Sequence, residues 1–244
     1  MPPFLQPFIQ PVQHFITLVQ KTMPPIHREG YLFITIGCVV TLLLMWTGLG
    51  AVGIVITAWI IYFFRDPVRM VPVGDGLVVS PGDGVVSLIE SGLQAPEELG
   101  LGTQTFNRIS VFLNVFDVHV NRIPIGGTIT KIHYRPGKFL SADLDKASVD
   151  NERNSLAIQT AQGDVIACVQ IAGLVARRIV CDATEQQAVE TGDRYGIIRF
   201  GSRVDLYIPL DVQPQVVVGQ RVLGGETVMA DLRSKPAIRQ AQPK

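Results

Sequence analysis

Four short polar stretches are the parts of this 244-residue sequence whose residue types could do chemistry. They read FRDP at residues 64–67, SPGDG at 80–84, DVHVNR at 117–122 and FGSR at 200–203. The sequence contains no HExxH, no GxSxG and no P-loop, so the common signatures of zinc proteases, serine esterases and nucleotide enzymes are missing. Chemistry is therefore expected from these four stretches.

The stretch at 117–122 places a carboxyl group and an imidazole two residues apart. On a regular strand Asp117, His119 and Asn121 share one face, while Val118 and Val120 are buried on the other. A histidine beside a carboxylate can be held in one tautomer with a raised pKa, which suits it to proton transfer. The same pattern occurs in ordinary half-exposed strands, so it is a weak signal alone.

The other stretches are ordinary when each is taken singly. SPGDG is a good turn, in which Asp83 would bond nearby backbone. Gly201-Ser202 is the only Gly-Ser dipeptide in the chain and lies between two strand-like runs, an unusual place for a flexible pair. FRDP directly follows an apolar run, and its plain interpretation is a polar, solvent-exposed end to that run.

Seven segments taken together resemble the phosphatidylserine decarboxylase family in its short, archaeal-type form. In order they are FFRDP at 63–67, SPGDG at 80–84, DVHVNRIP at 117–124, PGKF at 136–139, NERN at 151–154, AGLVARRI at 172–179 and FGSRVD at 200–205. No single segment is decisive, but seven in the family's order are highly specific.

The resemblance implies a pyruvoyl-dependent carboxy-lyase that is made as a proenzyme and cleaves itself between Gly201 and Ser202. The Ser202 hydroxyl would attack the Gly201 carbonyl, and elimination and hydrolysis would leave a covalent pyruvoyl group in place of Ser202. The products, a β chain of residues 1–201 and an α chain of 202–244, must stay associated. The ketone would form a Schiff base with the serine headgroup and accept electrons as CO2 leaves, converting phosphatidylserine to phosphatidylethanolamine. Archaetidylserine is the alternative substrate.

The resemblance also implies roles for individual residues. Asp83 and a histidine assist self-cleavage and a histidine assists protonation; His119 matches the first histidine of the family's segment. Longer members carry a second histidine where this chain has Arg122, and a guanidinium cannot act as a base near neutral pH. Either His119 performs both roles, or Asp83 activates Ser202 through another group.

Three arginines are candidates for binding lipid phosphate or carboxylate at a bilayer surface, namely Arg65, Arg177 and Arg178. Solvated surface arginines are the competing interpretation of each one. No metal and no external cofactor are expected, because the cofactor would be made from Ser202.

These residues need a scaffold, and the pattern after residue 64 is mainly β. Short β-branched runs between Gly and Pro predict strands at 77–79, 85–88, 109–115, 128–132, 165–171, 196–200, 204–208, 216–218 and 226–230. Regularly spaced strands with frequent turns predict a β-sandwich or barrel-like catalytic domain. Residues 183–190 suggest one short helix.

Residues 31–64 form a run of 34 without a charged side chain. One straight helix of that length would measure about 51 Å, against a hydrocarbon core of about 30 Å. The turn-like GLGAVG at 48–53 divides the run, so we predict an α-helical membrane hairpin that either spans the bilayer or dips into one leaflet. Arg28, Arg65 and Arg69 flank the run, and basic residues at both ends favour a catalytic domain on the cytoplasmic side of the cell membrane.

The predicted domains are a leader at 1–30, the hairpin at 31–64 and a β-rich decarboxylase domain at 65–244. In the leader, Val12, Phe15, Ile16 and Val19 recur at helical spacing, which fits an interfacial helix or a helix packed on the main domain. The family makes a homo-oligomer plausible.

Composition excludes some classes of function. The chain has 21 basic and 21 acidic residues, and this zero formal charge gives no support to nucleic-acid binding. Three cysteines without a CxxC motif disfavour a disulfide framework or a structural zinc site and suit a reducing compartment.

Two other functions stay open on the sequence. A membrane-anchored, non-catalytic β-rich binding module would remain a full-length chain. A membrane serine hydrolase using Ser202 with His119 and Asp83 would be labelled at Ser202 by a fluorophosphonate.

Overall fold

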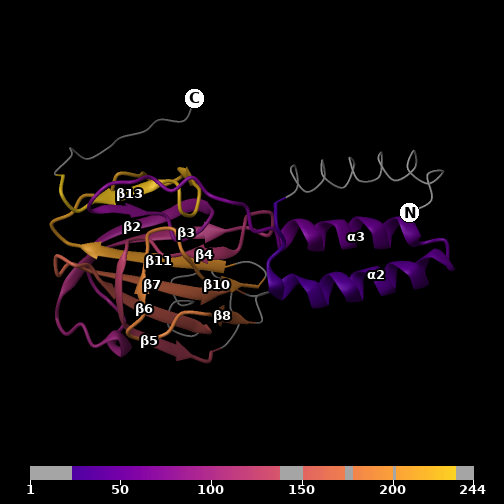
Figure 1. The fold of residues 1–244 in the computed structure, drawn as a ribbon, viewed down its shortest axis with the longest axis horizontal. Coiled ribbons are helices and arrows are strands. Elements are labelled where there is room, and N and C mark those ends of the chain that lie inside the picture. The colour runs from indigo at the N-terminus through magenta and orange to yellow at the C-terminus, as the bar shows by residue number, and fades with distance from the viewer. Residues whose placement is uncertain (1–23, 138–150, 174–177, 200–201, 235–244) are drawn as a thin grey trace, which may run out of the picture. The chain divides into compact units, whose positions relative to one another are not determined.

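The computed structural model describes residues 24–137, 151–173, 178–199 and 202–234 (Figure 1). The chain divides into two compact units, Met1–Val68 and Arg69–Lys244. Each unit has its own secondary structure, and each is described by itself.

The first unit is a helical hairpin. A short 3-10 turn, η2 (Arg28–Gly30), leads into α2 (Tyr31–Met45), and α3 (Gly50–Phe63) returns after a tight turn. Gly48 in that turn has φ 79°, a left-handed conformation that glycine adopts without steric cost. The interruption predicted near residues 48–53 is therefore present, and it divides the apolar run into helices of 15 and 14 residues.

Small residues bring the two helices close together. The Thr41 and Thr57 hydroxyls lie 2.9 Å apart, and a Cβ added at Gly53 would lie 2.9 Å from the Thr41 Cα. Most other side chains of the hairpin are apolar and exposed. Residues 28–45 are long and apolar enough to cross a membrane by length and composition, whereas α3 is shorter. Such a helix is weak evidence for membrane association.

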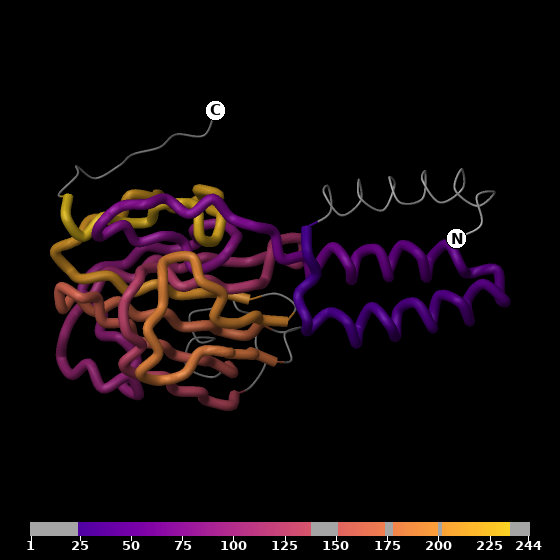
Figure 2. Tube along the Cα trace, in the orientation of Figure 1, coloured from indigo at the N-terminus to yellow at the C-terminus, as the bar shows by residue number. Residues whose placement is uncertain are grey.

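The second unit is built on a curled antiparallel sheet (Figure 1). Within the described residues its spatial order is β12 (Arg221–Val222), β2 (Gly84–Gln94), β3 (Thr105–Leu113), β11 (Ser202–Pro209), β7 (Val165–Ala172), β6 (Arg153–Gln159), β5 (Gly127–Arg135) and β9 (Ala188–Val189). The trace in Figure 2 shows β11 running between strands that come much earlier in the chain.

Smaller sheets complete the unit. One has the order β4 (Val120–Arg122), β10 (Arg194–Ile198), β8 (Ile179–Cys181), and another pairs β1 (Leu77–Val79) with β13 (Val228–Asp231). The three-stranded sheet faces the large one, with β8 against β6 and β7, and β10 against β7. The main core lies on the inner face of the large sheet, and a smaller apolar cluster lies on its outer face beside η3 (Glu97–Leu99).

The predicted mainly β fold is confirmed, with two local corrections. Residues 183–190 are turns followed by β9, so the predicted helix is wrong; Gln187 N–H instead bonds the Thr184 carbonyl in a turn. Residues 216–218 form no strand, because the chain turns there: the Gln220 N–H donates to the Val217 carbonyl at 3.1 Å, and the Val217 N–H donates to Gln220 Oε1 at 3.2 Å. The short strands β4, β8, β9 and β12 and the longer β6 carried too little apolar periodicity to be predicted.

Candidate functional site

Ser202 begins β11 and lies in a row across three neighbouring strands. It pairs with Ala172 on β7, and the Ala172 N–H donates to the Glu152 carbonyl 3.0 Å away. Because adjacent strands lie about 4.8 Å apart, the backbones of Ser202 and Glu152 are separated by about 10 Å. Residues directly across antiparallel strands share a face, so Ser202 and Glu152 both point to the inner side of the sheet.

A second row crosses the three-stranded sheet opposite. Ile179 on β8 pairs with Ile198 on β10, whose N–H donates to the His119 carbonyl at 3.2 Å. The Glu152 Oε1 atom accepts the Ile179 N–H at 3.0 Å, which ties the two rows together. The registers therefore bring Ser202 and His119 to the same end of two facing sheets.

The Ser202 side chain is completely buried. Among the described residues its hydroxyl has no hydrogen-bond partner, which is uncommon for a buried polar group. Its predicted cleavage partner, Gly201, lies outside the described residues. A serine held at a strand start with an unoccupied hydroxyl is available for reaction with a neighbouring group.

His119 is also completely buried. The Nδ1 atom lies 3.0 Å from the main-chain carbonyl of Asp117. The carboxylate of Asp117 accepts from the Asn114 N–H and from Arg221 instead. Because a carbonyl only accepts, Nδ1 carries the proton in this contact.

The stretch 117–122 is buried throughout, so it differs from the ordinary half-exposed strands that share its polar pattern. β4 begins only at Val120. On the side of β4 away from β10, the Arg122 N–H donates to the Pro81 carbonyl at 2.9 Å, in the bend that precedes β2. The Arg122 guanidinium donates to the Gly192 carbonyl at 3.0 Å. Arg122 is thus bonded to backbone, in keeping with its unsuitability as a base.

Asp83 is held from two directions in the bend at residues 80–84. Its Oδ1 atom accepts the Gly224 N–H at 2.8 Å, and Oδ2 accepts from the Arg69 guanidinium at 2.7 Å. Burial raises the pKa of Asp83, while the Arg69 charge and these two bonds oppose that rise. Sequence reasoning missed Arg69 and Gly224, because nothing in the local pattern marks either as a partner of Asp83.

A chain of buried amides connects the two sheets to this bend. The Asn154 Nδ2 atom donates to Gln170 Oε1 at 2.8 Å, and Gln170 Nε2 donates to Asn121 Oδ1 at 2.8 Å. Asn121 Nδ2 lies 3.4 Å from the Pro81 carbonyl, which can only accept, so the direction of the whole chain is fixed. Gln170 pairs with Val204, two residues from Ser202. These amides therefore run beside the candidate site.

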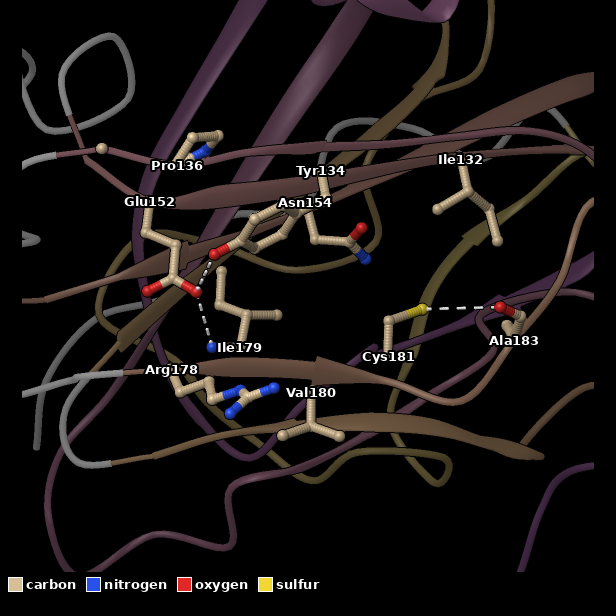
Figure 3. Close-up of a pocket in the computed structure, with 11 residues that line it drawn as sticks. Ile132, Tyr134, Pro136, Glu152, Asn154, Arg178, Ile179, Val180, Cys181 and Ala183 are labelled. Atoms are coloured by element: carbon tan, nitrogen blue, oxygen red, sulfur yellow. Dashed lines mark hydrogen bonds between the residues drawn. The ribbon is translucent and has the colours of Figure 1, made fainter.

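A cavity of about 580 Å³ opens on the inner face beside Glu152 (Figure 3). Its walls come from β5, β6 and β8 and from the segments next to them: Ile132, Tyr134, Pro136, Gly137, Glu152, Asn154, Arg178, Ile179, Val180, Cys181 and Ala183. Within the described ranges, no three His, Cys, Asp or Glu side chains are grouped to hold a metal ion.

The predicted arginines fall in different places. Arg178 is exposed and lines the cavity. Arg65 belongs to the hairpin unit, where its guanidinium donates to the Tyr62 carbonyl at 2.7 Å and lies 3.7 Å above the Tyr62 ring. Arg177 lies outside the described residues.

Comparison with known proteins gives the family. A model of the family described as phosphatidylserine decarboxylase matches residues 56–230. The chain is 58% identical over 226 residues to a phosphatidylserine decarboxylase proenzyme of Cereibacter sphaeroides, an alignment that covers 92% of this chain and 97% of that protein. It is 54% identical over 229 residues to the proenzyme of Saccharopolyspora erythraea, covering 93% and 97% of the two chains.

A third relative, the phosphatidylserine decarboxylase proenzyme of Rickettsia bellii, is 56% identical over 222 residues, covering 90% of this chain and 96% of that protein. These matches make the protein a carboxy-lyase. The chain belongs to the phosphatidylserine decarboxylase family.

Proposed function

We propose that the chain is a self-processing decarboxylase that converts phosphatidylserine to phosphatidylethanolamine and CO2, using a pyruvoyl group made from Ser202. The relatives are named as proenzymes of this activity. The observation that carries the assignment to Ser202 is its buried hydroxyl, which has no hydrogen-bond partner in the described part of the chain and lies at the same end of the sheets as His119.

In self-cleavage, the Ser202 oxygen attacks the Gly201 carbonyl carbon, and the peptide nitrogen leaves to give an ester. Loss of the Ser202 α-proton then expels the Gly201 carboxylate, and water releases ammonia to leave a ketone at position 202. His119 is suited to accept the hydroxyl proton through Nε2, because Nδ1 is committed to the Asp117 carbonyl. Asp83 is proposed to assist from its bend, held there by Arg69.

The two chains would remain one folded unit after the cut. β11 pairs with β3 along one edge and with β7 along the other, so the chain 202–244 contributes a central strand of the sheet. A segment of 43 residues is too short to keep a core alone, and its release would break both ladders.

The residues around position 202 fit a pyruvoyl group. Position 202 is buried opposite the small side chain of Ala172, and the buried amide Gln170 lies opposite Val204 two residues further along the strand, which supports this fit. When formed, the ketone supplies an electron sink for the loss of CO2. His119 is proposed to return a proton to the product carbon, and Arg178 to bind lipid carboxylate or phosphate from the cavity wall.

The hairpin is proposed to anchor the enzyme in the cell membrane with the catalytic domain on the cytoplasmic side. Its exposed apolar surface supports membrane contact, and Arg28 and Arg65 at its two ends support that orientation. Arg65 stacked on Tyr62 is typical of a side-chain pair at the membrane interface. A homo-oligomer is a further proposal that rests on the family alone.

The intact mass of the purified protein tests the proposal. We expect two chains, ending at Gly201 and starting at residue 202 with a ketoacyl group in place of serine. An unbroken chain with an ordinary seryl residue that still decarboxylates phosphatidylserine would refute it. A stable uncut chain without activity would favour the binding module, and fluorophosphonate labelling of Ser202 in an uncut chain would favour the hydrolase.

A further inference from the structure

The cavity beside β6 contains a buried carboxylate that has no charge partner among the described residues. Glu152 is 3% exposed, and its Oε1 atom accepts from the Tyr134 hydroxyl at 2.9 Å and from the Ile179 N–H at 3.0 Å (Figure 3). Its other oxygen has no hydrogen-bond partner among the described residues, and Glu152 makes no ion pair with any of them. A buried carboxylate is costly unless a positive group compensates it.

The guanidinium group of Arg178 lines the same cavity but forms no ion pair with Glu152. Figure 3 shows Arg178 and Glu152 toward one end of the cavity, with Cys181 and Ala183 at the other end. Arg178 also makes no ion pair within the described part of the chain. Two opposite charges that line one space without pairing are complementary to a ligand that carries both signs.

The position of the carboxylate relative to Ser202 also fits a ligand that reaches both. Glu152, Ala172 and Ser202 form one row, with about 10 Å between the outer backbones and all three side chains on the inner face. A headgroup with an amine at its tip can therefore contact Glu152 and still lie within reach of position 202.

We infer that Glu152 is the recognition site for the primary ammonium of the serine headgroup, and that Arg178 pairs with the headgroup's carboxylate. This inference rests on the proposed function and names the part of the site that selects the headgroup. The free Glu152 oxygen accepts an N–H of the ammonium, while Tyr134 and Ile179 hold the other oxygen and fix the direction of the carboxylate. Glu152 would accept one proton from the ammonium and leave the amine nitrogen with a lone pair, which the chemistry of a ketone at position 202 would require.

Direct lipid binding to the uncleaved Ser202→Ala chain tests the inference without any ketone present. Short-chain phosphatidylserine and phosphatidylglycerol carry the same net charge, but only the first has an ammonium group. A charge-assisted hydrogen bond contributes on the order of a tenfold to hundredfold change in affinity. We expect the Ser202→Ala chain to bind phosphatidylserine at least about tenfold more tightly than phosphatidylglycerol.

Adding Glu152→Gln should abolish this preference, because the amide keeps the size of the side chain but loses the charge. Glu98→Gln is the matched control: Glu98 is a partly buried carboxylate on the outer face, paired with Arg153 and bonded by Ser155, and the preference should survive there. Arg178→Gln should weaken phosphatidylserine binding more than phosphatidylethanolamine binding, because only the first has a carboxylate.

A preference that persists in the Glu152→Gln chain, or is absent from the Ser202→Ala chain, would overturn the inference. If Glu152→Gln does not fold, Tyr134→Phe is the alternative variant, because it keeps the Glu152 charge but removes one of the two hydrogen bonds that orient the carboxylate. An unchanged preference for phosphatidylserine in that variant would also count against the inference. Failure of the proposed function would be visible separately, as a wild-type chain that never cleaves whatever its lipid preference.

Discussion

The two faces of β11 carry different kinds of buried polar group, a neutral hydroxyl on one face and paired charges on the other. On the inner face, the Ser202 hydroxyl is buried without a hydrogen-bond partner in the described part of the chain. On the outer face, the Arg203 Nε atom lies 2.9 Å from Asp205 Oδ1, and the Arg108 guanidinium lies 3.9 Å from the same carboxylate. One strand therefore carries an unbonded hydroxyl and a charge network on alternate residues.

We infer from this difference that the charged groups on the outer face stabilise β11, whereas the hydroxyl on the inner face serves the proposed reaction. The outer charges brace β11 against β3, where Arg108 also pairs with Glu90, so the inner face need not supply its own polar bonds. Burial raises the pKa of Tyr207 in this network to about 12, and the phenol stays neutral through the physiological range. Tyr207 is consequently a neutral member of the outer network.

Replacing the inner hydroxyl should have the largest effect on function and almost none on stability. Ser202→Ala should abolish self-cleavage and decarboxylation, because no nucleophile remains. It also removes an unsatisfied buried hydroxyl, so its free energy of unfolding should equal that of the uncleaved wild-type chain or exceed it by about 1 kcal/mol. Intact mass and urea unfolding in detergent micelles measure the two effects.

The matched control is Ser155→Ala on the outer face, where the hydroxyl donates to Glu98 at 3.0 Å. This variant should cleave normally and lose about 1 kcal/mol of stability. If Ser202→Ala were the more destabilising of the two, the contrast between the faces would be wrong.

Breaking the outer network should have the largest effect on stability. Asp205→Asn removes the carboxylate that faces Arg203 and Arg108, leaving two buried guanidinium groups near each other. Loss of one member of a buried charge network costs about 3–5 kcal/mol, so thermal unfolding should move to a much lower temperature.

Glu90→Gln is the control within the same network. Glu90 is 41% exposed at its side chain, and exposed pairs contribute less than about 1 kcal/mol. Equal losses in Asp205→Asn and Glu90→Gln would contradict the view that burial of Asp205 makes the network strong.

The amide chain on the inner face should matter for processing more than for folding. Gln170→Met keeps the approximate volume but leaves Asn121 and Asn154 without their partner, at a cost of about 1–3 kcal/mol. The bend holding Asp83 would lose its side-chain link through Asn121 to β7, and we expect self-cleavage of the folded chain to slow by about tenfold, equivalent to about 1.4 kcal/mol.

Asn107→Leu supplies the comparison for Gln170→Met. Asn107 is a buried amide that donates to the Val212 carbonyl at 2.8 Å and to the Leu210 carbonyl at 3.1 Å, outside the amide chain. It should lose similar stability yet cleave at the wild-type rate per folded molecule. Equal slowing in both variants would show that Gln170 acts only through stability.

The smallest expected effect is a shift in pH dependence from Arg69→Met. If ionised Asp83 assists self-cleavage, the rate increases with pH through the pKa of Asp83. Burial raises that pKa and Arg69 lowers it, so removing Arg69 should move the rising limb to higher pH. Single-turnover cleavage of refolded chain over a pH series measures the shift.

Arg233→Met is the control, because Arg233 pairs with Asp164 at 2.7 Å on the surface and should leave the pH profile in place. If the rising limb of the pH profile moves to lower pH in Arg69→Met, or moves equally in both variants, Arg69 is not the residue that positions Asp83.

Parts of the fold were readable from local pattern. The strand at 77–79 was predicted with its exact bounds, and the one at 165–171 to within one residue, because β-branched runs between turn residues mark a buried strand. The segments at 183–190 and 216–218 were misjudged because long-range backbone bonds, such as Gln186 N–H to Ile129 O, decide their conformation.

Local sequence patterns were enough to predict the apolar hairpin and the mainly β domain, and seven ordered segments indicated the family and its candidate residues Ser202, His119 and Asp83. The partners of these residues were decided only by tertiary structure. Arg69 beside Asp83, Gln170 beside Asn121 and Glu152 beside Ile179 are distant in sequence, and strand register and sheet packing bring them together. Periodicity reports which face of its own strand a side chain occupies, but it carries no information about which strand lies opposite.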